Sequence, residues 1–459
     1  MKRFEEVYSC DSVTLNVTNN CNLACTYCFE KSKSKVMMTT DTAIKAIDKT
    51  YRDTGKDRDP FTINFFGGEP LLNWEAIKAV VDHCNEKSYR VRYGMTTNLT
   101  MLTDEMVKYI DDNSIALLVS VDGIKSIHDK NRCNSFDTVY KNMKRLIDEG
   151  LGIYIEARMT ILPEDIEYAK DGVKMLFDMG IDNLCPMPVN DVPWSKEDIK
   201  KAKEFYLDMM KFFTDTMNDE SNTRNISIKN CDDMMVNIMS PDQDDPVMCP
   251  IFENTWCTID SYGDVYACHQ GPTSVSKEKE YLRVGNLDFI DETKLTTIKK
   301  KATYPKNRCK GCKGRAICKC GCPTENLRST GTYDAPSDAY CDLQIALAEA
   351  VLEYHEEILN ASNLRNHMIV MLQENIKIKK YLDSMCDDIS IDDKLQLYTR
   401  MSHVKEMITN IHDSLFPSFR WYIDEKLKYI TALLLAKDNL TFAQVESYID
   451  KKKGMVVNG

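Results

Sequence analysis

The chain lacks the long apolar run that marks a membrane-spanning protein. No stretch of its 459 residues approaches the roughly 18 consecutive apolar residues that a spanning helix needs. Residues 1–6 carry charges where a secretory signal peptide has an apolar segment. The sequence therefore predicts a cytoplasmic protein with no membrane association.

The chain also lacks an excess of basic residues. Lys and Arg number 59 against 71 for Asp and Glu, which gives a net charge of -12. Because contacts with nucleic-acid phosphates need clustered Lys and Arg, we expect no nucleic-acid partner. A hydrophobic content of 43% is that of an ordinary folded protein, and the length allows two or three domains.

Cysteine, by contrast, is abundant. In a chain without an export signal, 18 cysteines indicate metal ligands and not a disulfide framework. Most of them fall in two dense groups, at 21–28 and 249–341. The isolated ones are predicted to be small buried apolar residues: Cys10, Cys84, Cys133, Cys185, Cys231 and Cys386.

Short apolar runs alternate with helical patterns through the first part of the chain. Strands are expected at 13–18, 61–66, 90–97, 115–121, 152–160 and 183–188. Helices are expected between them, at 40–51, 73–87, 104–111, 136–149 and 164–179. This order predicts an α/β fold, a partial (β/α)6 barrel of the TIM type, whose chemistry lies at the carboxyl ends of its parallel strands.

Composition changes twice further along, which suggests three domains. We expect the barrel over 1–235, a cysteine-rich domain over 236–345 and a helical segment over 346–459. The cysteine-rich stretch is poor in helical periodicity, with one strand expected at 281–287, so metal ligation would replace a thin core.

Three cysteines follow the first expected strand of the barrel. Cys21, Cys25 and Cys28 have the spacing CxxxCxxC on one short loop. Such a loop suits an iron-sulfur cluster in which one iron has no protein ligand and can bind a substrate. The alternative is a structural zinc site that borrows Cys10 or His83 as its fourth ligand.

The second strand ends in a glycine pair followed by a carboxylate. Gly67 and Gly68 would let a ligand approach the backbone, and Glu69 could accept hydrogen bonds from an ammonium group. Together with the preceding cysteine loop, this segment resembles the radical S-adenosylmethionine (SAM) superfamily. That resemblance implies a SAM-binding 4Fe-4S cluster, a 5′-deoxyadenosyl radical and an external one-electron donor such as flavodoxin or ferredoxin.

The resemblance also implies positions for SAM. Tyr27 would lie beside the adenine, and Gly67, Gly68 and Glu69 would hold the methionine amino group. Further candidates are Thr97 and Asn98 at the end of the third strand, Ser120 and Asp122 near the ribose, and Arg158 or Arg132 for the methionine carboxylate.

The second group of cysteines follows a pattern of its own. Its members are Cys249, Cys257, Cys268, Cys309, Cys312, Cys318, Cys322 and Cys341. This spacing resembles the SPASM domain of radical SAM maturases, which implies two auxiliary 4Fe-4S clusters. The first would be held by Cys249, Cys257, Cys268 and Cys322, and the second by Cys309, Cys312, Cys318 and Cys341. A zinc ribbon is the alternative, and Cys320 is a spare thiol.

His269 directly follows Cys268, where anaerobic sulfatase maturases have an Asp that serves as base. We predict that His269 is the catalytic proton acceptor, with a hydrogen-bonded supporting role as the alternative. The expected function is oxidative modification of a peptide or protein side chain, as a crosslink or thioether in a ribosomally made peptide. The alternatives are a formylglycine-forming sulfatase maturase and a non-catalytic iron-sulfur carrier or scaffold. Because the cluster loop begins so early, leader-peptide recognition is expected from the C-terminal helical segment or a separate protein.

Overall fold

The computed structural model describes residues 1–30, 33–53, 60–219, 254–272, 277–301 and 321–360, with 222, 224, 226–229, 249, 309, 312, 314 and 318. The chain divides into two compact units, and Met1–Met234 with Gln243–His355 form the first. Apart from 356–360, the second unit lies outside the described residues, as do the helices expected after 360. The three domain boundaries expected from composition stay a prediction.

A single twelve-stranded sheet runs through the described residues, in the order β1-β12-β11-β10-β9-β2-β3-β4-β5-β6-β7-β8. The strands are β1 (Lys2–Arg3), β2 (Ser12–Thr18), β3 (Phe61–Gly67), β4 (Val91–Thr97), β5 (Ala116–Ser120), β6 (Ile155–Ile161), β7 (Asn183–Pro188), β8 (Ser227–Ile228), β9 (Trp256–Ile259), β10 (Asp264–Tyr266), β11 (Arg283–Asn286) and β12 (Phe289–Ile290). Strands β2 to β8 are all parallel, which confirms the predicted α/β partial barrel.

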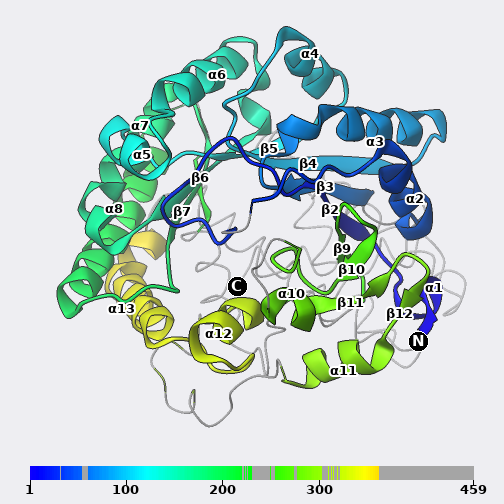
Figure 1. Ribbon diagram of the computed structural model, residues 1–459. Helices are drawn as coiled ribbons and strands as arrows, with labels where there is room; N and C mark the ends of the chain where they lie inside the picture. The colour runs from blue at the N-terminus through cyan, green and yellow to red at the C-terminus, as the bar shows by residue number, and fades with distance from the viewer. Residues whose placement is uncertain are drawn as a thin grey trace, which may run out of the picture. The chain divides into compact units, whose positions relative to one another are not determined.

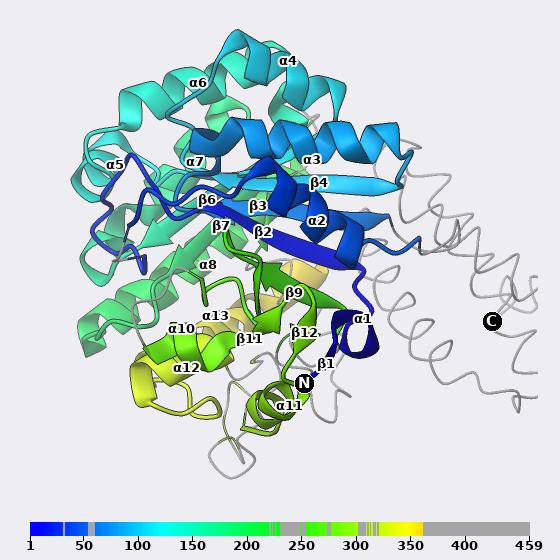
Figure 2. The same cartoon turned by 45° about the vertical axis from the view of Figure 1, so that its right-hand side comes forward.

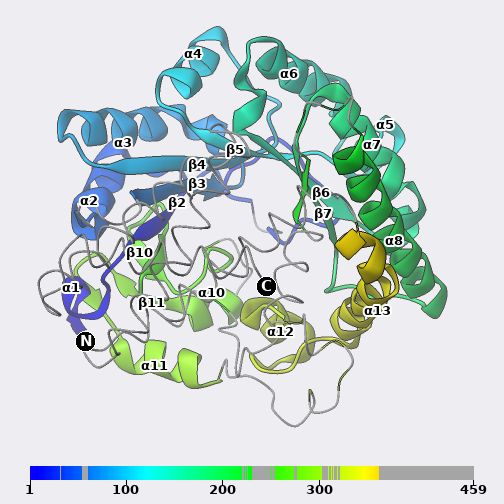
Figure 3. The ribbon, with the colours of Figure 1, turned by 180° about the vertical axis from the view of Figure 1, so that it is seen from behind.

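Helices cover the outer face of this sheet, as Figures 1 and 3 show from opposite sides. The α-helices are α1 (Phe4–Val7), α2 (Thr40–Thr50), α3 (Trp74–Glu86), α4 (Asp104–Asp112), α5 (Lys125–Asn131), α6 (Phe136–Asp148), α7 (Ala169–Met179), α8 (Lys196–Asn218), α10 (Lys277–Leu282), α11 (Glu292–Lys301), α12 (Pro323–Thr330) and α13 (Asp338–Asn360). Three 3-10 helices are η1 (Pro70–Asn73), η2 (Leu151–Tyr154) and η3 (Pro163–Tyr168). The hydroxyls of Thr39, Thr103 and Ser195 cap α2, α4 and α8 by accepting backbone N–H groups.

The strands alternate between buried and half-buried side chains. In β3, Phe61, Ile63 and Phe65 are buried against the helices, whereas Thr62 and Asn64 are half-buried. The same alternation runs through β4, β5 and β6. Because successive side chains point to opposite faces, the half-buried set lies on the inner face of the barrel sheet.

The cysteine-rich region continues the same sheet. Strand β9 pairs in parallel with β2, and β10, β11, β12 and β1 follow as an antiparallel ribbon. Figure 2 shows these strands grouped with α10, α11 and α12 below β2. The expectation of little helix in this region was wrong, because three helices lie in it; the strand expected at 281–287 begins only at Arg283, after α10.

Within the part of the chain that the structure describes, no helix has the length and apolar character needed to cross a membrane.

Candidate functional site

The cysteine loop follows β2 and is fixed by contacts with the end of α5. The N–H of Thr26 donates to the carbonyl of Asn131 at 3.0 Å, and the N–H of Ala24 donates to Cys133 Sγ at 3.2 Å. Cys133 is exposed, so its predicted burial was wrong, whereas Cys10, Cys84 and Cys185 are buried as predicted. Cys231 and Cys386 lie outside the described residues.

The three thiols of the loop suit a metal cluster. Cys21, Cys25 and Cys28 are half-buried, and burial raises the pKa of each thiol, to about 11 for Cys25. The charges of Cys21 and Cys28 both act on Cys25, so the three sulfur atoms lie near one another. Among the described residues, no three His, Cys, Asp or Glu side chains converge on a single metal ion. A four-iron cluster makes a different demand, because each thiolate binds a separate iron.

The glycine pair after β3 brings the chain against the start of the cysteine loop. The N–H of Gly68 donates to the carbonyl of Thr18 at 2.9 Å, and the N–H of Glu69 donates to that of Asn20 at 2.8 Å. A Cβ on Gly67, whose φ is 135°, would lie 2.1 Å from the Thr18 carbonyl oxygen. The glycines are therefore needed for this backbone contact.

Glu69 itself is fully buried and bonded within the protein. Its carboxylate accepts hydrogen bonds from the N–H of Leu71, the hydroxyl of Thr97 and the N–H of Asn98, at 2.7–3.1 Å. Burial raises its pKa to about 7, although these hydrogen bonds act in the opposite direction. The structure thus ties Glu69 to the end of β4, and its contact with the SAM amino group stays a prediction.

An unused acceptor lies beside this segment. Asn16 is fully buried on β2, and its Oδ1 accepts no hydrogen bond from the described residues. The same oxygen lies 2.5 Å from the place that a Cβ on Gly67 would occupy. A buried acceptor without a donor fits an ammonium group such as that of SAM.

Asn98 joins the third strand end to the cysteine loop. Its Nδ2 donates to Asn22 Oδ1 at 2.9 Å and lies 3.9 Å from Cys21 Sγ. Its Oδ1 accepts from the N–H and hydroxyl of Thr100. The predicted SAM residue thus lies directly beside the first cluster cysteine.

Tyr27, Asp122 and Arg132 form a buried network. The hydroxyl of Tyr27 donates to Asp122 Oδ2 at 2.5 Å, and Arg132 Nε lies 2.9 Å from the same oxygen. The N–H of Thr160 donates to Asp122 Oδ1 at 3.0 Å, and the Arg132 guanidinium lies 5.3 Å from the centre of the Tyr27 ring. Both candidates for SAM contact, Asp122 and Arg132, are therefore paired with each other.

His128 belongs to this network and was missed by sequence reasoning. It is fully buried, and its Nδ1 accepts the N–H of Asp122 while its Nε2 lies 2.9 Å from Ser135 Oγ. Because Ser135 donates its hydroxyl hydrogen to the Arg132 carbonyl, Nε2 carries the imidazole hydrogen. Burial lowers the pKa of His128 to about 4, so the ring is neutral at physiological pH. The sequence feature that could have indicated its role is its position four residues before Arg132.

Arg158 points to the inner face from β6. Its Nη1 lies 3.2 Å from Cys185 Sγ on β7, and it pairs in register with Ser120 of β5. Its positive charge also acts on His269. Which of Arg158 and the buried Arg132 holds the SAM carboxylate stays open.

His269 lies among aromatic rings of the inner face. Its ring centre is 5.1 Å from that of Phe66 on β3 and 6.0 Å from that of Trp256 on β9, both in edge-to-face orientation. Burial opposes both charges in the Cys268–His269 pair, but their attraction and hydrogen bond outweigh it. The pKa of Cys268 therefore lies below its ordinary value and that of His269 above.

Three of the four cysteines predicted for the first auxiliary cluster lie near one another. The charges of Cys268 and Cys249 both raise the pKa of Cys322, after the larger effect of its burial. The fourth, Cys257, lies elsewhere, with its Sγ 3.9 Å from that of Cys10.

The cysteines predicted for the second auxiliary cluster gather at the start of α13. Cys318 Sγ lies 3.8 Å from the hydroxyl of Tyr340, the neighbour of Cys341. Gly314 places Cys312 near the same helix, because a Cβ on Gly314 would lie 3.8 Å from Cys312 Sγ and 3.6 Å from the carbonyl oxygen of Gln344. The N–H of Cys312 also donates to the carbonyl of Cys309. Cys320 lies outside the described residues.

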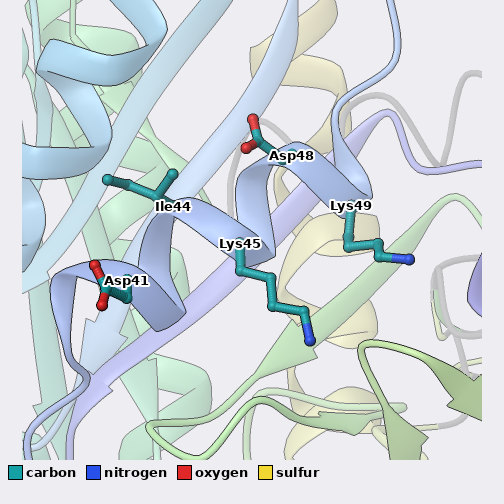
Figure 4. Close-up of a pocket in the computed structure, with 5 residues that line it drawn as sticks. All are labelled: Asp41, Ile44, Lys45, Asp48 and Lys49. Atoms are coloured by element: carbon teal, nitrogen blue, oxygen red, sulfur yellow. The ribbon is translucent and has the colours of Figure 1, made fainter.

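A surface hollow of about 330 Å³ lies on α2, away from these residues. Its lining residues are Asp41, Ile44, Lys45, Asp48 and Lys49 (Figure 4). Lys45 and Lys49 pair with Asp288, and Asp48 lies 2.8 Å from His83. His83 is thus paired with Asp48 on α2, and this contact does not support the role of zinc ligand considered for it.

Comparisons with known proteins identify the family. The family model described as the radical SAM superfamily matches residues 15–176. The 7-carboxy-7-deazaguanine synthase of Methanocaldococcus jannaschii is 30% identical over 186 residues, which are 37% of this chain and 72% of that protein. The chain belongs to the radical SAM superfamily. A radical SAM 4Fe-4S cluster and SAM belong with this family, and the assignment of that cluster to Cys21, Cys25 and Cys28 stays a prediction.

More extended similarities lead to the maturases. The cysteine-type anaerobic sulfatase-maturating enzyme of Clostridium novyi is 25% identical over 339 residues, covering 66% of this chain and 85% of that enzyme. The solved structure of native anSMEcpe with bound AdoMet and Cp18Cys peptide aligns with a TM-score of 0.60 and 19% identity, over 76% of this chain and 98% of that one. Streptococcus suis SuiB bound to precursor peptide SuiA aligns with a TM-score of 0.51 and 14% identity, over 73% and 76%. The chain is thus similar in sequence to the anaerobic sulfatase-maturating enzyme of Clostridium novyi, and it shares the fold of anSMEcpe and SuiB.

Proposed function

We propose that this radical SAM enzyme oxidatively modifies a side chain of a peptide or protein, forming a thioether or crosslink in a ribosomally made peptide. The observation that carries the proposal is the placement of His269, the residue after Cys268, on the inner face between Phe66 and Trp256. A peptide is the expected substrate because anSMEcpe and SuiB, which share the fold, have been solved with bound peptides.

The cofactors supply the radical chemistry and the chain positions the substrate. When bound, the cluster and SAM provide a 5′-deoxyadenosyl radical that removes one hydrogen atom from the substrate. Formation of a carbon-sulfur bond from a thiol then releases one proton and one electron. We assign the proton to His269, whose ring lies on the inner face beside Phe66 and Trp256.

The electron needs an acceptor within reach of the substrate. We propose that two auxiliary 4Fe-4S clusters in the predicted SPASM domain, 236–345, accept it, whereas the electron that starts the reaction comes from an external donor such as flavodoxin or ferredoxin. The grouping of Cys249 with Cys268 and Cys322, and of Cys318 with the start of α13, supports both cluster sites. Residues 346–459 remain the proposed place for leader recognition.

Formylglycine formation is the second candidate. The sequence similarity to the Clostridium novyi sulfatase-maturating enzyme, over 66% of this chain, favours it. Against it stands His269, in the position where we expect a sulfatase maturase to have an Asp. The interaction of His269 with Cys268 also distinguishes this imidazole from the free carboxylate that such an Asp would supply.

The two candidates differ in their products. The reduced, reconstituted enzyme should form no aldehyde on a peptide with the sulfatase sequence Cys-x-Pro-x-Arg. A Cys-containing partner peptide encoded beside the enzyme should lose two hydrogen atoms without gaining oxygen, as measured by mass spectrometry. A triple variant with Cys21, Cys25 and Cys28 changed to Ala controls for both reactions. Efficient conversion of the sulfatase peptide to its aldehyde would reverse the ranking.

A further inference from the structure

The register of β9 against β2 fixes the side to which Cys257 points. Cys257 pairs with Val13, and Trp256 pairs with Ser12. Neighbours in a parallel pair point to the same face, and successive residues point to opposite faces. Val13 is fully buried beneath the helices, so Cys257 lies on the outer face of the sheet.

The other predicted ligands lie on the inner side. Trp256 donates its indole N–H to Thr14 Oγ1 at 3.1 Å and lies against the ring of His269. Cys268 directly precedes His269, whose ring lies against Trp256 on this side. The sheet therefore lies between the His269 segment and Cys257.

Cys257 already has a partner on its own side. Its Sγ lies 3.9 Å from that of Cys10, and the two residues are 0% and 3% exposed. Burial raises the pKa of the Tyr8 hydroxyl, and the charges of both thiols raise it further. This closed environment is that of a structural thiol pair.

We propose that Cys257 ligates no cluster and that the first auxiliary cluster is held by Cys249, Cys268 and Cys322. This assignment corrects the ligand set expected from spacing, and it rests on the proposed presence of the auxiliary clusters.

Iron content and spectroscopy of full-length variants test the ligand set without any measurement of activity. Reconstituted wild-type enzyme should contain about twelve irons, as three four-iron clusters. Cys257→Ala and its matched control Cys10→Ala should keep the wild-type iron content and electron paramagnetic resonance spectrum. Cys268→Ala and Cys322→Ala should each lose about four irons. If Cys257→Ala is not recovered folded, Cys257→Val, which also lacks a metal ligand, replaces it.

A loss of four irons in Cys257→Ala or Cys257→Val, matching that in Cys268→Ala, overturns the proposal. A wild-type content of only about four irons would instead remove the auxiliary clusters and with them the proposed function.

Discussion

At the scale of single residues, Asp122 connects the side chains and strands of the region predicted to bind SAM. It receives the hydroxyl of Tyr27 and the backbone N–H of Thr160, and it pairs with the buried guanidinium of Arg132. A carboxylate with three such partners is held in one orientation. The contact between Asp122 and Tyr27 also fixes the cysteine loop against the ends of β5 and β6.

Glu69 gives a prediction about pH. Its pKa in the folded protein is raised to about 7 from an ordinary value of 4.5, so the folded state binds the proton more tightly than the unfolded state. The resulting stabilisation is complete below about pH 4.5 and is lost as the pH rises through about 7. The free energy of unfolding of the wild type should therefore fall, relative to Glu69→Gln, by up to about 3 kcal/mol across this window.

Anaerobic urea unfolding at several pH values measures that difference, and difference infrared spectroscopy against Glu69→Gln measures the pKa directly. Added SAM should shift Glu69 toward its ionised form if the methionine ammonium lies beside it. Parallel stability curves for the two proteins would contradict the raised pKa. An unchanged Glu69 band on addition of SAM would contradict only the predicted contact with SAM.

These residues show what spacing can and cannot predict. The motifs identified the segments around Glu69 and Arg132, because glycine pairs and cysteine spacing are visible in the sequence. They did not reveal that the Glu69 carboxylate accepts hydrogen bonds from Thr97 and Asn98, because those partners lie at the end of another strand. The proposed exclusion of Cys257 has a related origin, because spacing does not tell on which face of a strand a cysteine lies.

At the scale of elements, hydrophobic alternation predicted the barrel well. The strand expected at 183–188 is β7 itself, and the others differ from the observed strands by a few residues. The largest difference is in β6, where the expected start at 152 is the 3-10 helix η2 and the strand begins at Ile155. Short elements such as α1 and α5 were not predicted, because a single turn or two has too little periodicity to be read.

The contact between α7 and the turn after Asp122 yields a second prediction. A Cβ on Gly172 of α7 would lie 2.8 Å from the Cα of Gly123 and 2.8 Å from the terminal methyl of Met159. Ala normally stabilises a helix relative to Gly, but here the contact leaves no room for it. Gly172→Ala should therefore destabilise the protein by about 1–3 kcal/mol, as measured by anaerobic urea unfolding.

Lys174→Ala is the matched control, because Lys174 lies on the exposed side of the same helix. It should change the free energy of unfolding by no more than about 0.5 kcal/mol. A stabilised Gly172→Ala variant would show that the helix and the turn can separate without cost.

At the scale of the whole described unit, the cysteine-rich region is not a separate module beside the barrel. Strand β9 extends the barrel sheet by pairing with β2, which joins residues such as Val13 and Cys257 across most of the chain. No local pattern could reveal that pairing, because a parallel neighbour can be distant in sequence. The sequence predicted the two regions and their ligands, whereas only the fold shows that the two regions share one sheet.

Arg328 on α12 joins both regions at a single side chain. Its Nη2 donates to Gln270 Oε1 at 2.6 Å, its Nη1 lies 3.5 Å from Asp191 Oδ2, and its guanidinium lies 5.6 Å from the ring centre of Phe29. Phe29 follows the last cysteine of the cluster loop, and Gln270 follows His269. The side chain thus holds the segment beside the first cluster and the segment beside the predicted base in one arrangement.

Removing this side chain should therefore loosen both segments together. In Arg328→Ala, amide hydrogen exchange at 27–30 and at 268–272 should rise by about tenfold, the factor that corresponds to the loss of one charged hydrogen bond. Arg328→Lys keeps the charge without the forked geometry and should give a smaller increase. Lys203→Ala, which breaks the half-exposed ion pair with Glu353, is the control and should leave both segments unchanged. An increase confined to 268–272 would mean that Arg328 supports only the auxiliary side, and that the two cluster regions are held together by the β2–β9 pairing alone.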